Sequence, residues 1–172
     1  PGLKKISLEL GGNAPFIVFD DADLDEAVVG AITCKYRNSG QTCISANRIL
    51  VQDGIYDAFV SRFADEVAAL RVADGFAEGA QVGPLIDEAA YQNVVQHLRR
   101  LQATALPLLA LQPEMSTGME ATEQLLGPHA FEMAHLSDVA QEVFGPVLHV
   151  VRWRGDPQAV VDQINELGYG LT

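Results

Sequence analysis

The chain has 172 residues, of which 48% are hydrophobic and 20% are charged, and its formal net charge is −12 at pH 7. These proportions are typical of a globular protein with a buried core, so intrinsic disorder is disfavoured. The negative charge disfavours binding to nucleic-acid phosphates. No run of 18 apolar residues predicts a transmembrane helix, and we expect one folded domain.

Strands and helices alternate in the first third of the chain. The apolar run 14–19 predicts a buried strand, and aspartates at 20–23 are candidate helix caps. A helix is predicted over 24–39, with Gly40 as its stop, and a second strand over 48–52.

The central part of the chain gives two more helical patterns. Apolar residues recur every three or four positions over 55–70, which predicts a helix. Asp87 is the predicted cap of another helix, whose apolar face spans 91–101. The apolar run 105–111 contains Pro107, which favours an edge strand.

The last part of the chain begins with a weak signal over 112–128. Strands are predicted over 129–136 and 146–153. A final helix is predicted to start at the cap Asp156, with a proline in its first turn, and to stop at Gly168. Alternating strands and helices predict parallel strands joined by right-handed crossovers, that is, an α/β three-layer sandwich with a mainly parallel sheet.

The cysteines and histidines give no metal or redox motif. Cys34 and Cys43 lie nine residues apart, which is neither a CxxC pair nor a zinc-ligand spacing. The four histidines are scattered, so we expect no metal site. A reduced, cytoplasmic protein is the interpretation that fits two unpaired cysteines. The first residue is Pro1, so we expect the sequence to be cut from a longer one.

The segment Gly40-Gln41-Thr42-Cys43 ends the first predicted helix with a cysteine. A cysteine is a nucleophile only as its thiolate, which backbone N–H groups or a nearby base can stabilise. The alternative is a buried, unreactive thiol. We interpret Cys34, which lies within the helix, in that second way.

The segment Leu8-Glu9-Leu10-Gly11-Gly12-Asn13 places one carboxylate between two leucines. The leucines predict a partly buried carboxylate, which suits a general base. The alternative is a solvated glutamate at a strand end. The glycine pair is no dinucleotide fingerprint, because that motif needs three spaced glycines. A third segment, Glu142-Val143-Phe144-Gly145-Pro146, is typical of a loop entering a strand.

The three segments together, in this order, resemble the aldehyde dehydrogenase superfamily. Residues 3–87 are most similar to succinate-semialdehyde dehydrogenases. Residues 141–172 resemble the pyrroline-carboxylate (glutamate-semialdehyde) dehydrogenase part of bifunctional proline-catabolic proteins. The stretch 102–140 lacks the family's Gly-Gly and aromatic-Pro-Thr features, so we expect it to be diverged.

The resemblance implies a thiol-based oxidation. Cys43 matches the nucleophile that adds to the aldehyde to give a thiohemiacetal, and later a thioester. Glu9 matches the base that activates the hydrolytic water. The backbone N–H of Cys43 would supply half of an oxyanion hole.

The resemblance also implies NAD or NADP as cofactor and a short acidic semialdehyde as substrate. Glu142 matches the carboxylate that holds the nicotinamide ribose, with Phe144 near the ring and Leu10 and Gly11 in the same cofactor site. Arg37 matches an arginine that binds the distal carboxylate of succinate semialdehyde. The alternative for Arg37 is a basic residue that offsets the helix dipole.

The resemblance predicts that residues 1–172 form a single catalytic, thiol-bearing domain, truncated relative to the family's longer chains. The N-terminal dinucleotide-binding domain and the C-terminal oligomerisation segment are expected to be absent. We therefore expect little dehydrogenase turnover from the isolated chain, and either self-association or a missing cofactor-domain segment as its partner. The alternatives are a catalytically inactive remnant or partner-binding module, and a cofactor-independent thiol esterase.

Overall fold

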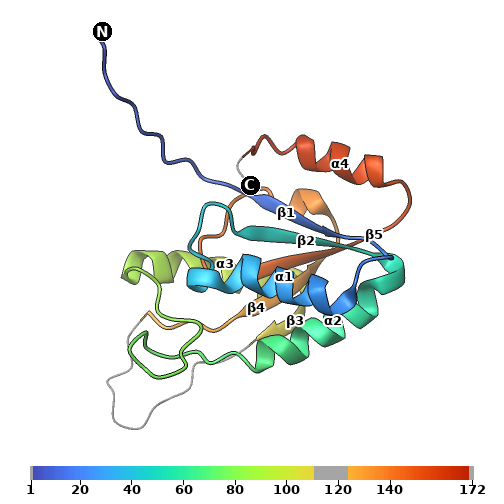
Figure 1. Cartoon of the computed structure of the whole chain (residues 1–172), viewed down its shortest axis with the longest axis horizontal. Coiled ribbons are helices and arrows are strands. Elements are labelled where there is room, and N and C mark those ends of the chain that lie inside the picture. The colour runs from blue at the N-terminus through green and yellow to red at the C-terminus, as the bar shows by residue number, and fades with distance from the viewer. Residues whose placement is uncertain (1, 111–123, 171–172) are drawn as a thin grey trace.

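The computed structural model describes residues 2–110 and 124–170, which form a five-stranded sheet with helices on both faces (Figure 1). The strand order is β1-β2-β5-β4-β3. Strands β1, β2, β5 and β4 are parallel neighbours, and β3 pairs antiparallel with β4 at the edge. The strands are β1 (Ala14–Val18), β2 (Ala46–Gln52), β3 (Leu106–Ala110), β4 (His129–Met133) and β5 (Val147–Trp153).

Four helices begin close to the predicted positions. The caps Asp23, Asp87 and Asp156 are confirmed, because each side chain accepts a hydrogen bond from a backbone N–H of the first turn. The elements are α1 (Leu24–Tyr36), α2 (Asp53–Ala68), α3 (Glu88–Thr104) and α4 (Pro157–Asn165), with short 3₁₀ turns η1 (Arg37–Gly40) and η2 (Leu136–Asp138).

The three-layer arrangement follows because successive side chains of the central strands pack on opposite faces of the sheet. Ile49 and Val51 of β2 pack in the core that includes α1 and α2. Leu50, between them, packs in the second core with α3 and α4. Successive side chains of a strand point to opposite faces, so a run of apolar residues buried on both sides is expected in a central parallel strand.

Several predicted bounds differ from the structure. The strand predicted over 129–136 ends at Met133, and the last helix, predicted to stop at Gly168, ends at Asn165. The first helix ends at Tyr36 instead of residue 39, because Asn38 and Ser39 adopt left-handed φ values of 52° and 58°. The sheet is mainly parallel, as predicted, and among the described strands β3 is the antiparallel one. An antiparallel edge strand on an otherwise parallel sheet is common in α/β folds. The prediction for residues 111–123 lies outside the described residues.

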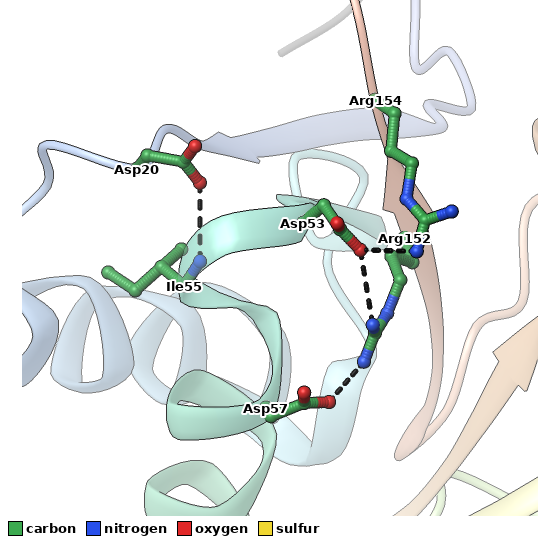
Figure 2. A network of polar contacts seen from close by, with 6 residues as sticks. All are labelled: Asp20, Asp53, Ile55, Asp57, Arg152 and Arg154. Carbon is green, nitrogen blue, oxygen red and sulfur yellow. Dashed lines mark hydrogen bonds and ion pairs between the residues drawn. The ribbon is translucent and has the colours of Figure 1, made fainter.

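The carboxyl ends of β1, β2 and β5 are joined by a polar network (Figure 2). The carboxylate of Asp20 accepts a hydrogen bond from Ile55 N at 3.2 Å. Asp53 bonds to both Arg152, at 3.1 Å, and Arg154, at 2.8 Å. The hydrogen bond from Arg154 is the main cause that lowers the pKa of Asp53. The polar network at these carboxyl ends therefore holds α2 against β5.

Candidate active site

The glycine pair of the first candidate segment lies with the other two segments at the amino ends of neighbouring strands. The glycine pair at 11–12 directly precedes β1, Cys43 precedes β2, and Gly145 precedes β5. These strands are parallel neighbours in the order β1-β2-β5, so their amino ends meet. The fold thus brings together segments that are 34 and 99 residues apart in the sequence.

The glycine pair contacts the third segment directly. Gly12 N donates a hydrogen bond to Glu142 Oε1 at 3.2 Å. A Cβ atom on Gly11 would lie 2.7 Å from Glu142 Oε2, which is closer than Cβ atoms approach other heavy atoms. A side chain at position 11 would displace the flexible end of Glu142, so the glycine leaves room for that carboxylate to lie against this backbone.

The cysteine segment contacts the third segment through a second glycine. Gly40 has φ +76°, and a Cβ atom on it would overlap the backbone carbonyl of Gly145. Ser39 Oγ anchors the same turn by accepting from Gly83 N at 3.0 Å and donating to Gly83 O at 2.9 Å. The left-handed turn and the close approach together fix where the chain enters the cysteine segment.

Cys43 lies in the turn between η1 and β2, where Ser45 N donates to Thr42 O at 3.0 Å. Its thiol is unpaired and half-buried. Cys34, on α1, is also unpaired and half-buried, so exposure alone does not distinguish the two thiols.

Glu9 does not have the partly buried environment predicted for it. It lies in an extended segment that leads away from the sheet (Figure 1), and its carboxylate is exposed. Leu8 is 70% and Leu10 61% exposed, so the flanking leucines do not enclose the carboxylate. The prediction was wrong because leucines bury a neighbouring residue only where they have a surface to pack against.

The remaining predicted residues lie on the surface of the same end of the molecule. Glu142 is half-buried and Phe144 is 45% exposed. Both line a cavity of about 880 Å³ between α3 and the segment that precedes β5. Arg37 is exposed at the end of α1, which is compatible with either interpretation of this residue.

A buried lysine was missed by sequence reasoning. Lys35 of α1 is fully buried, and its Nζ donates to Asn47 Oδ1 at 2.7 Å. Burial lowers the pKa of Lys35 to about 7, and Cys34 and Glu142 offset part of that effect. The available signal was spacing: Val28, Ala31 and Lys35 lie on one helix face, so the lysine continues a buried stripe.

Two histidines beside Lys35 were treated as isolated in the sequence. His97 of α3 and His149 of β5 are hydrogen-bonded through their Nε2 atoms at 3.0 Å, and His149 Nδ1 donates to Asn47 O at 2.9 Å. Burial lowers the pKa of His149 to about 3 and that of His97 to about 4. Among the residues that the structure describes, no group of three or more potential ligands could hold a metal ion.

A third polar contact joins β2 to Asn13, the residue that follows the glycine pair. Arg48 of β2 is 1% exposed, and its Nη2 donates to the backbone carbonyl of Asn13. Asn13 Nδ2 in turn donates to Val139 O at 3.0 Å. Asn13 precedes β1 and Arg48 lies within β2, and nothing in the sequence distinguishes these two polar residues from exposed ones.

The fold is an α/β sheet protein in which three sequence segments meet at the amino ends of neighbouring parallel strands. The chain belongs to the aldehyde dehydrogenase family, whose pattern matches residues 1–172. It is 46% identical to a glutarate-semialdehyde dehydrogenase of Pseudomonas putida and 45% identical to the succinate-semialdehyde dehydrogenase [NADP(+)] GabD of Escherichia coli. Each match covers 98% of the chain and 34% of the relative, so the chain spans about a third of their length.

Solved structures agree with both parts of the predicted resemblance. A bifunctional proline utilization A (PutA) protein is similar with a TM-score of 0.87 at 29% identity, over 94% of this chain and 16% of that one. A succinate-semialdehyde dehydrogenase from Burkholderia pseudomallei has a TM-score of 0.80 at 42% identity, over 92% and 33%. In the described part of the chain, no helix has the length and apolarity to cross a membrane.

Proposed function

We propose that residues 1–172 form the thiol-bearing catalytic part of an NAD(P)-dependent dehydrogenase that oxidises a short acidic semialdehyde to its carboxylic acid. The observation that supports it best is the meeting of three segments at one sheet edge, through the Gly12–Glu142 hydrogen bond and the Gly40–Gly145 contact. Because the chain spans about a third of its relatives' length, we place the main dinucleotide-binding segment outside these residues.

In this proposal Cys43 is the nucleophile. Its thiolate adds to the aldehyde carbon, forming a C–S bond, and the backbone N–H of Cys43 stabilises the resulting oxyanion. A nicotinamide held beside Glu142 and Phe144 would accept a hydride from this adduct, which would leave a thioester on Cys43. Glu9 then removes a proton from water, which attacks the thioester carbon and releases the acid and the Cys43 thiol. A free thiol works only where it stays reduced, so we place the chain in the cytoplasm.

The residues around Glu142 suit the ribose of a nicotinamide nucleotide. A carboxylate accepts hydrogen bonds from ribose hydroxyls, and Glu142 lies against Gly11 at the lining of the cavity. Phe144, at 45% exposure, offers an apolar face beside it. Leu10 is exposed next to Gly11 and would contact the same cofactor. Either NAD or NADP fits this proposal, because none of these residues is proposed to contact the adenosine ribose, where the two cofactors differ.

The substrate class is proposed from the relatives and from Arg37. The relatives named above act on glutarate and succinate semialdehydes. The exposed guanidinium of Arg37 lies six residues before Cys43, and it could pair with the distal carboxylate of such a substrate. In a longer chain that carries the cofactor-binding segment, Arg37→Met should weaken turnover of succinate semialdehyde but leave butanal unaffected, in assays with NAD and NADP in parallel.

The nucleophile can be tested without a cofactor. We expect p-nitrophenyl acetate to acylate the chain with a burst of one p-nitrophenolate per chain. The burst should disappear in Cys43→Ala and persist in the matched variant Cys34→Ala. A burst that survives in Cys43→Ala would overturn the proposal, and a chain inert in this assay would favour the inactive remnant. Continued rapid hydrolysis through Cys43, without dehydrogenase turnover, would favour the thiol esterase.

A further inference from the structure

The ladder between β1 and β2 is interrupted at the point where the glycine pair enters the sheet. Ala14 pairs with Ala46, but Pro15 pairs with Arg48, so the register shifts by one residue between them. Proline also has no N–H to donate. The backbone ladder therefore holds the chain weakly just upstream of Pro15, where the glycine pair lies.

The side chain of Arg48 supplies a donor at this interruption. Its Nη2 donates to the carbonyl of Asn13, the residue between the glycine pair and β1. Nε and Nη1 of Arg48 are buried without a hydrogen-bond partner among the described residues. A buried cation with unsatisfied donors is costly for folding.

Asn13 connects Arg48 to the segment that carries Glu142, the proposed cofactor-binding carboxylate. Its side chain donates to Val139 O at 3.0 Å, on the segment that leads to Glu142. The preceding residue, Gly12, donates its N–H to Glu142 Oε1 at 3.2 Å. The strand that follows Cys43, the glycine pair and the Glu142 segment are therefore connected through Asn13 and Arg48.

We propose that Arg48 is a positioning residue, which holds the Asn13 carbonyl so that the Gly12 N–H stays aimed at the Glu142 carboxylate. This inference rests on the proposed function only in assigning Glu142 to the cofactor. Arg48 contacts neither substrate nor cofactor and acts through the backbone of the glycine pair.

The test uses the whole 172-residue chain and the amide resonance of Gly12. We expect this amide shift to follow the protonation of Glu142 in a pH titration of the ¹⁵N-labelled protein, and the response to vanish in Glu142→Gln. In Arg48→Met the response should fall by at least about threefold, because hydrogen bonds weaken steeply with distance and misalignment. The matched control is Arg152→Met, at the opposite ends of the strands (Figure 2), which should keep the response.

An undiminished Gly12 response in Arg48→Met, or its absence in the wild type, would overturn the inference. If Arg48→Met does not fold, Arg48→Lys replaces it. The lysine nitrogen lies about one bond short of Nη2, so the response should again fall, and full retention would overturn the role. The titration needs no turnover. A failure of the ester assay therefore counts against the proposed function alone, and a failure here leaves Cys43 acylation untouched.

Discussion

Lys35 is the residue whose environment most directly opposes its charge. It is fully buried, its hydrogen bond goes to the neutral amide of Asn47, and its pKa is lowered to about 7 from 10.5. Between these two values the unfolded chain binds more protons than the folded one. Stability should therefore rise with pH across this window, and the cost of burying the charge is fully present below pH 7.

Lys35→Met should raise the free energy of unfolding at pH 6. The pKa difference limits the gain to about 5 kcal/mol, and the lost bond to Asn47 reduces it to about 1–3 kcal/mol. Most of the gain should disappear by pH 10. Urea unfolding at both pH values measures it, with the exposed Lys4→Met as control; a gain equal at the two pH values would contradict the buried-charge explanation.

Single residues were predictable from sequence only where they sit in a motif. Cys43 and Glu142 stood out because each belongs to a segment with neighbouring glycines. Arg48 did not, because one polar residue within a strand leaves no pattern of its own. Lys35 belongs to no motif, and only its helical spacing from Val28 and Ala31 indicates burial. Glu9 shows the opposite error: its leucine neighbours predicted burial that tertiary packing does not provide.

At the scale of elements, the turn η1 determines how the cysteine segment meets β5. Gly40→Ala would force alanine into φ +76° and its Cβ into the Gly145 carbonyl. We expect a loss of at least about 2 kcal/mol in stability and a smaller ester burst at Cys43. The control is Gly75→Ala, where a Cβ meets nothing within 4 Å. Equal urea midpoints for the two variants would show that the close approach is unimportant.

Helix starts and apolar strands were predicted well, whereas the sequence left the direction of the edge strand β3 open. The caps Asp23, Asp87 and Asp156 are local signals, because each aspartate satisfies N–H groups of its own first turn. Strand direction depends on the path of the chain between two strands. The sequence signal over 112–128 was too weak to supply that path.

At the scale of the whole molecule, the site follows from one topological fact. Each chemical segment directly precedes a strand, and β1, β2 and β5 are parallel neighbours. The sequence predicted both the segments and a mainly parallel sheet. It could not give the strand order, because the β1-β2-β5 neighbourhood depends on long-range packing.

Acid should destabilise the whole fold through the histidine pair. Burial lowers the pKa of His149 to about 3 and that of His97 to about 4, from 6.5. Each contributes stability above pH 6.5 that is lost as the pH falls towards 4, because the unfolded chain takes up the protons first. We expect the pair to account for a loss on the order of 3 kcal/mol between pH 7 and 4.

A double variant tests this acid effect. Asparagine at 149 can keep the hydrogen bond to Asn47 O, and glutamine at 97 can keep the contact between the two side chains. His97→Gln with His149→Asn should make the fall in stability from pH 7 to 4 shallower, whereas exposed His135→Asn should not. Urea midpoints measured from pH 7 to pH 4 test this expectation. If the midpoint falls equally in the double variant and the wild type, the histidine pair is not the cause of the acid effect.

The most direct measurement of the central claim, that Cys43 and Glu9 act on one acyl group, is the lifetime of the acyl adduct. Intact-mass spectrometry after mixing with p-nitrophenyl acetate follows the adduct in the wild type and in Glu9→Gln. The account predicts an adduct on Cys43 that persists at least about tenfold longer in Glu9→Gln, because the general base is lost. Equal lifetimes, or an adduct carried by Cys34, would contradict it.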